Sequence, residues 1–190
     1  HVYKVDDPDW STVFEVVGRR FVRGSNEVDW RKALKNSPNG KGIIRRKCLK
    51  CSGEHKEIYY RRITDWPDSM NIRNLFVDTW WIGNGNQFNV DFELYSKYDD
   101  AVNRQNKWKW CNANDNGIGF PRDCGQYGGR GGQWRSWSNR VKSYRWGDHW
   151  VYDIETTDFI IPGIIDYTDT SDPEPEDAAA LAEGIAWENQ

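Results

Sequence analysis

The amino-acid sequence predicts an all-β or mostly β domain of the β-sandwich or jelly-roll type, with one or two short helices and an extended C-terminal arm. Much of its apolar content is aromatic, with 12 Trp, 9 Tyr and 7 Phe against a single Met. Aromatic and β-branched side chains pack well on a pleated surface and favour strands over helices. The 17 glycines supply turns between short apolar runs, and roughly eight strands at such spacing are typical of a sandwich.

The first third of the chain alternates strand and turn signals. Residues 26–35 carry apolar side chains at a spacing that fits a short helix. The following stretch, 36–42, contains Asn, Pro and Gly and predicts a loop. Four runs rich in β-branched or aromatic residues predict strands. These runs are residues 13–18, 21–23, 43–46 and 57–64.

The middle of the chain carries the clearest strand pattern. Residues 75–83 and 88–95 flank a loop with Asn-Gly-Asn and predict a β-hairpin. Because side chains alternate between the faces of a strand, we expect Phe92 and Leu94 to be buried and Glu93 to be solvated. The full alternation sets Phe88, Val90, Phe92 and Leu94 against Asn89, Asp91, Glu93 and Tyr95.

The last part of the body predicts one more helix and further strands. Residues 96–105 have helical spacing, with Ser96 as the expected N-cap. Residues 107–111 alternate as a strand that ends at a cysteine, and the long Gly-rich loop 112–132 follows. A loop of this length is more often functional than incidental. Residues 144–146 and 150–154 predict the closing strands.

Charge divides the chain into two parts. The net charge is only −3, yet no Lys or Arg follows Arg145, whereas twelve Asp and Glu do. An asymmetry of this size is typical of an interaction tail. We therefore expect a domain over 1–157 and an acidic arm or linker over 158–190.

The arm has two interpretations. A run such as 169–177 is usually solvated and disordered. Apolar residues flank it on both sides, however, and a tail that only confers solubility has little use for them. We therefore predict that the arm engages a neighbouring copy of the chain, forming a homo-oligomer or polymer. The residues expected to do so are Phe159, Ile160, Ile161, Ile164, Ile165, Tyr167 and Trp187.

The four cysteines predict two disulfides and an oxidising compartment. A zinc site is the alternative, because Cys48 and Cys51 have CxxC spacing. Cys111 and Cys124 have twelve residues between them, which fits no common four-cysteine zinc template. Four cysteines allow three connectivities. The Gly-rich loop favours a Cys111–Cys124 bridge among them.

The surplus of tryptophan predicts exposed aromatic side chains. A small sandwich cannot bury twelve indoles, although core packing is the better explanation for any single one. Exposed indoles stack on sugar rings, and aromatics are also enriched at protein interfaces. The candidate residues for a carbohydrate or interface surface are Trp80, Trp81, Trp108, Trp110, Trp134 and Trp137.

The sequence contains only weak indications of a catalytic site. His1 could bind copper through its amino group and ring, with His149 or His55 as the second imidazole and Tyr152 or Tyr144 as axial neighbour. No other motif of a copper-dependent polysaccharide oxidase accompanies it. No nucleophile elbow, phosphate loop or dinucleotide fingerprint is present. We therefore expect neither enzymatic activity nor a cofactor.

The remaining classes are excluded or ranked by composition. No apolar run approaches the roughly 18 residues that span a bilayer. Nucleic-acid binding ranks low because the chain is acidic, with a pI of about 5.7, despite basic clusters such as 45–47. The leading hypothesis is a secreted, non-enzymatic structural or assembly subunit, with filaments as one possible product. The alternatives are a lectin-like carbohydrate-binding module and a copper-dependent polysaccharide oxidase that uses an N-terminal histidine.

Overall fold

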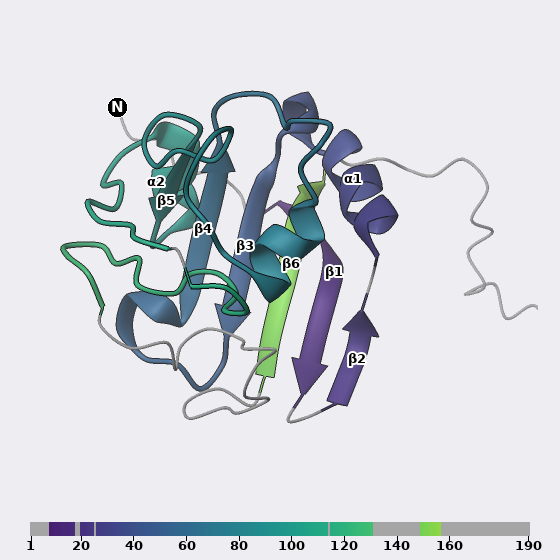
Figure 1. The fold of residues 1–190 in the computed structure, drawn as a ribbon, viewed down its shortest axis with the longest axis horizontal. Coiled ribbons are helices and arrows are strands. Elements are labelled where there is room, and N and C mark those ends of the chain that lie inside the picture. Colours follow the sequence, from purple (N-terminus) through teal and green to yellow (C-terminus); the bar gives the residue numbers. More distant parts are fainter. Residues whose placement is uncertain (1–7, 18–19, 25, 114, 131–148, 157–190) are drawn as a thin grey trace, which may run out of the picture. The chain divides into compact units, whose positions relative to one another are not determined.

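The computed structural model describes residues 8–17, 20–24, 26–113, 115–130 and 149–156. Within them the strands form one antiparallel sheet of six strands in the order β2-β1-β6-β3-β4-β5 (Figure 1). The strands are β1 (Asp9–Val17), β2 (Arg20–Gly24), β3 (Ile43–Cys48), β4 (Glu57–Arg62), β5 (Phe92–Tyr95) and β6 (His149–Thr156).

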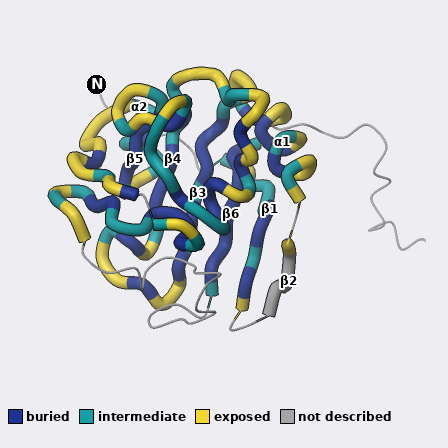
Figure 2. The backbone as a smooth tube through the Cα atoms, in the orientation of Figure 1, coloured by how far each residue is buried: buried dark blue, intermediate teal, exposed yellow. Residues whose placement is uncertain are grey.

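The last of the described strands lies in the middle of the sheet. β6 pairs with β1, where Tyr152 faces Phe14, and with β3, where Ile154 faces Ile44. It therefore joins the β1–β2 hairpin to the meander of β3, β4 and β5. The strands β3, β4 and β6 are buried over most of their lengths, whereas the connecting segments alternate between exposed, intermediate and buried residues (Figure 2).

Two α-helices and three shorter helical segments connect the strands. Helix α1 (Glu27–Lys35) confirms the predicted helix and begins with a capping box, in which Asn26 and Asp29 exchange side-chain and backbone hydrogen bonds. Helix α2 (Tyr98–Asn103) is shorter than predicted, and its N-cap is Lys97 rather than Ser96. Ser96 instead accepts a hydrogen bond from the indole of Trp108. The shorter segments are η1 (Pro38–Gly40), η2 (Gly53–His55) and the π-helical η3 (Asn74–Asp78).

One face of the sheet carries the main core, beneath α1, η3 and the long connections (Figure 1). Its centre is Tyr60, whose ring stacks on Phe92 at 4.9 Å and meets Phe76 edge-on at 5.0 Å between centroids. The Tyr152 hydroxyl donates to the carbonyls of Phe76 and Phe120, each at 3.1 Å. We call this side the aromatic face.

The opposite face, here the polar face, carries charged groups and a small apolar cluster under α2. Tyr59, Tyr95 and Ala101 are buried there. Asp153 binds Arg45 and Lys47 at 2.9 and 3.0 Å. This face is therefore largely covered, although its side chains are polar.

Several features of the sequence-based prediction are confirmed and others are corrected. The mostly β class and its few short helices are confirmed. The described residues contain a single sheet, so the sandwich or jelly-roll arrangement stays a prediction. Residues 134, 137, 144–146 and the arm at 158–190 lie outside the described residues, and no feature predicted for them is tested.

The predicted hairpin of 75–83 with 88–95 is wrong. Residues 74–78 are π-helical, and the Phe76 carbonyl within them accepts long-range bonds from the Phe120 N–H at 2.8 Å and from Tyr152. Strand β5 begins only at Phe92, after a turn in which Asn89 has a φ of 62°. Phe92 and Leu94 are buried as predicted, but Glu93 is buried too, at 3% exposed. Residues 107–111 form no strand, only a bridge between Trp110 and Gly125.

Candidate functional site

The loop after residue 107 holds the most exposed of the described tryptophans. Trp110 is 47% exposed. Its carbonyl accepts the Gly125 N–H at 3.0 Å, and the Lys109 N–H donates to the Gln126 carbonyl at the same distance. A disulfide joins Cys111 to Cys124 directly beside this bridge. The backbone under Trp110 is therefore fastened both covalently and by hydrogen bonds.

Glycine packs against the indole itself. A Cβ added at Gly129 would lie 2.7 Å from the indole nitrogen of Trp110, closer than real Cβ atoms approach. Only glycine therefore allows the backbone to lie so near this ring edge. The indole keeps its orientation while nearly half of the residue stays in contact with solvent.

Tyr127 follows Gly125, the bridge partner of Trp110, by two residues and is 75% exposed. Arg130 follows, and its Nε donates to the Glu54 carboxylate at 2.6 Å. Burial alone would raise the pKa of Glu54, but the hydrogen bonds from its own backbone and from Arg130 lower it. Trp110, Tyr127 and Arg130 define what we call the Trp110 surface: two exposed rings and one ordered cation on a single loop.

The other sequence-predicted aromatics lie elsewhere. Trp80 and Trp108 are fully buried, so neither is available for a ligand or partner at the surface. Trp80 packs edge-on against Phe120 at 4.7 Å between centroids, within the core of the aromatic face. Trp81 is half-buried and packs against the same core. Tyr127 was missed by sequence reasoning, although an aromatic residue inside a Gly-rich loop is a usable signal.

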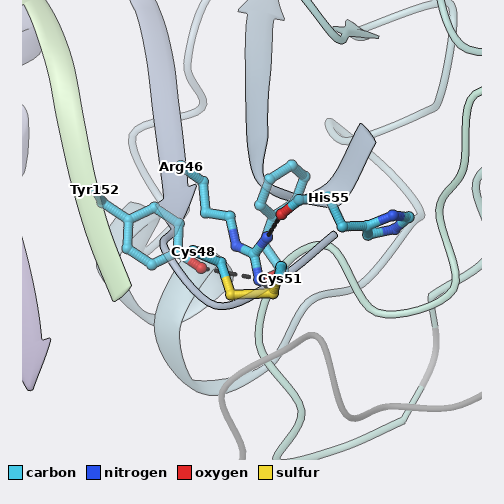
Figure 3. The surroundings of a disulfide bond; sticks show 6 residues. Arg46, Cys48, Cys51, His55 and Tyr152 are labelled. Atoms are coloured by element: carbon cyan, nitrogen blue, oxygen red, sulfur yellow. Dashed lines mark hydrogen bonds between the residues drawn. A yellow bond between two sulfur atoms is a disulfide. The ribbon is translucent and has the colours of Figure 1, made fainter. Parts of the chain in front are cut away.

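The second disulfide, Cys48–Cys51, confirms the expectation of two bridges and leaves no free cysteine among the described residues. It closes the turn after β3 and lies beside the buried Arg46 (Figure 3). Arg46 donates to the His55 carbonyl at 2.6 Å and lies 3.9 Å from the Cys51 sulfur. Its guanidinium also lies over the Trp150 ring at 4.5 Å. The cluster ties η2 to the sheet.

The two described histidines, His55 and His149, each bond another group of the fold. His55 is fully buried, bonds the Cys124 carbonyl at 2.9 Å and packs against Trp108. His149 pairs with Glu15 at 2.7 Å. His1 lies outside the described residues, so the copper hypothesis is untested. Among the residues described, no group of three or more His, Cys, Asp or Glu could hold a metal ion.

The polar face contains a cavity that the sequence did not indicate. Its volume is 490 Å³, and Ile43, Arg61, Tyr98, Val102 and Glu155 contribute to its wall. Glu155 accepts hydrogen bonds from the Tyr98 hydroxyl at 2.6 Å and from the Ile43 N–H at 3.0 Å. Strands β3, β4 and β6 and helix α2 all contribute, and no local motif predicts such an assembly.

No family model, curated protein sequence or solved structure matches the chain. In the part of the chain that the structure describes, no helix is long and apolar enough to cross a membrane.

Proposed function

We propose that the folded body is a non-catalytic, lectin-like carbohydrate-binding module whose ligand stacks on the Trp110 surface. The observation that carries this proposal is an exposed indole held in place by a disulfide, a backbone bridge and a glycine contact. A ring that is fixed before binding loses little conformational entropy when a sugar covers it. Loops on a rigid scaffold are also where binding residues concentrate.

The polar groups of this surface suit a ligand rich in hydroxyls. Arg130 donates to Glu54, so both side chains are ordered near the exposed rings. The Gln126 amide lies within hydrogen-bonding distance of the Ser96 hydroxyl, at 3.3 Å. Apolar rings with a few fixed polar groups are the usual composition of a small-molecule site. The proposal therefore places sugar stacking on Trp110 and Tyr127 and hydroxyl recognition on their polar neighbours.

The test is a glycan array probed with the full chain, followed by gel electrophoresis through the polysaccharide that binds. We expect Trp110→Ala to weaken binding about tenfold or more, as for a central aromatic contact. Tyr127→Ala should weaken it less. Val28→Ala removes an exposed apolar side chain on α1 and serves as the control. Equal binding by Trp110→Ala and the wild type would contradict the proposal.

A second candidate function, self-assembly through residues 158–190, is favoured by the separation of charge along the chain. Twelve acidic residues follow the last basic one, so the arm and the basic body are electrostatically complementary. The apolar residues of the arm would then pack against the neighbouring copy, as in strand addition. A head-to-tail contact of this kind propagates into filaments unless it closes a ring.

Assembly is tested by light scattering after size-exclusion chromatography of the full chain. The double variant Ile160→Asp with Ile164→Asp should reduce the assembled mass to that of the monomer, while Val28→Asp on α1 should not. A wild type that stays monomeric at high concentration would remove this candidate. A secreted, extracellular location suits both functions and the two disulfides, and a jelly-roll sandwich stays the proposed arrangement of the whole domain.

A further inference from the structure

The cavity on the polar face is built around one arginine. Arg61 lies on β4, with Ile43 of β3 opposite on one side and Glu93 of β5 opposite on the other. Its Nη1 donates to the carbonyls of Ala101 and Val102, at 2.7 and 3.0 Å, in the last turn of α2. These two bonds fix the plane of the guanidinium against the helix.

The other N–H groups of that guanidinium, on Nε and Nη2, are available to a ligand. Among the described residues, Arg61 makes no ion pair, and its Nε and Nη2 donate to no acceptor. These two N–H groups form the side edge of the guanidinium fork, the geometry that binds both oxygens of a carboxylate at once. The neighbouring cations of the wall differ, since Arg104 binds Glu93 at 3.0 Å and Lys41 binds Asp65 at the same distance.

The lining of the cavity also contains hydrogen-bond acceptors, from β6 and α2. The two oxygens of Glu155 each accept one bond, from Tyr98 and from the Ile43 N–H. A carboxylate oxygen can accept a second bond, and the Tyr98 hydroxyl oxygen can accept as well. The Ile43 and Val102 side chains add apolar surface to this lining.

We propose that this cavity, which we call the Arg61 cavity, binds a polyhydroxylated carboxylate of the uronic-acid class. Arg61 takes the carboxylate, and Glu155 and Tyr98 take hydroxyls. A carboxylate without hydroxyls would leave the acceptors of Glu155 and Tyr98 unused, whereas a neutral polyol would leave the fork of Arg61 unused. The volume of 490 Å³ lies within the range of roughly 300–1,000 Å³ for small-molecule sites. The proposal uses none of the residues of the Trp110 surface and does not depend on it.

Isothermal titration calorimetry of the full chain tests the proposal with galacturonate, galactose and acetate. We expect saturable binding of galacturonate and at least about tenfold weaker binding of galactose and of acetate. Galactose lacks the carboxylate that Arg61 would bind, and acetate lacks the hydroxyls that Glu155 and Tyr98 would bind. A short oligogalacturonide as a fourth ligand separates the two sources of this chemistry. Tighter binding of the oligomer indicates a polysaccharide, and equal binding indicates the free acid.

Two variants test the role of Arg61. Arg61→Gln should weaken galacturonate binding about tenfold or more, and Arg61→Lys should weaken it too, because lysine keeps the charge but lacks the fork. The matched control is Arg31→Gln, since Arg31 on α1 also donates to main-chain carbonyls. Thermal unfolding verifies that each variant is folded. If Arg61→Gln does not fold, the result for Arg61→Lys alone decides the test.

Three results would overturn the proposal. The first is a wild type that binds no galacturonate, and the second is wild-type affinity in both Arg61 variants. The third is acetate bound as tightly as galacturonate, which would show that the hydroxyl groups contribute nothing to binding. Trp110→Ala should bind galacturonate normally, so failure at the Arg61 cavity and failure at the Trp110 surface are distinguishable.

Discussion

The two faces of the sheet are both covered, but by different chemistry. On the aromatic face, the Tyr60 ring meets Phe76 edge-on and stacks on Phe92, at centroid distances typical of aromatic pairs. On the polar face, buried carboxylates such as Asp153 and Glu93 are each held by two cations. The comparison shows that one set of strands can bury rings on one surface and carboxylates on the other when the buried carboxylates are paired with cations. It also places the Arg61 cavity on the face where fixed charges are available.

The largest difference between the faces should appear on truncating a ring. Phe92 is fully buried and contacts Tyr60 and Trp80. We expect Phe92→Ala to lower the free energy of unfolding by about 3–5 kcal/mol, measured by urea denaturation. Val90→Ala, two residues away but exposed, should change it by no more than about 0.5 kcal/mol. Similar losses in the two variants would contradict the assignment of Phe92 to the core.

The layer over the aromatic face is also fastened by a disulfide. Cys111 and Cys124 close a loop with a sequence separation of 13, whereas Cys48 and Cys51 are separated by 3. Because the stabilisation grows with loop length, replacing the first pair by alanine should cost about 2–4 kcal/mol and the second pair less. Urea denaturation of the two double variants measures both losses. A larger loss for the Cys48–Cys51 pair would show that Arg46 and its contacts, rather than loop closure, dominate.

On the polar face the matched charges should each contribute a smaller amount. Asp153 is buried, and it accepts bonds from Arg45, Lys47 and Thr12. Asp153→Asn keeps the shape but removes the charge, and we expect a loss of about 2 kcal/mol. The control is Asp65→Asn, because Asp65 pairs with Lys41 but is almost fully exposed. Equal effects of the two changes would mean that burial adds nothing to the Asp153 contacts.

The smallest effect should be an acid sensitivity specific to the polar face. Burial alone would raise the pKa of Glu93, but hydrogen bonds from Arg104, Tyr95 and Lys107 outweigh it and lower the pKa to about 2. Glu93 therefore stabilises the fold above its ordinary pKa of 4.5, and this contribution disappears as the pH falls from there towards 2. The stability difference between the wild type and Glu93→Gln should shrink over the same range in urea titrations. A difference that stays constant with pH would contradict this role.

The sequence predicted the parts of this fold that depend on local signals. The helix at 27–35 has its cap and its apolar spacing within ten residues, and the strand at 57–62 is rich in β-formers. The π-helical turn was missed because its apolar run resembles a strand locally, whereas the Phe76 carbonyl bonds Phe120 and Tyr152, both distant in sequence. Glu93 was expected in solvent because of the alternation along the strand. It is buried instead, and its partners Arg104 and Lys107 come after the strand has ended.

The candidate sites also depend on contacts between distant residues, which the sequence did not predict. Trp108 and Trp110 share the alternation of a strand, yet one is fully buried and the other is half exposed, because the segment forms only an isolated bridge. Their composition predicted an aromatic surface but not which ring would supply it. The Arg61 cavity draws on segments more than a hundred residues apart, from Ile43 to Glu155, and no sequence spacing encodes such a meeting.

The central position of β6 has a consequence for biosynthesis. A chain emerging from a ribosome can pair β1 with β2, and β3 with β4 and β5, well before residue 149 is made. The β1–β2 hairpin and the β3–β4–β5 meander cannot join into one sheet until β6 is made. The pairing of β6 with β1 spans up to 147 residues. Such high contact order slows folding and leaves unpaired strand edges open in the meantime. Chaperones that shield strand edges should therefore matter most for nascent chains that end just before His149.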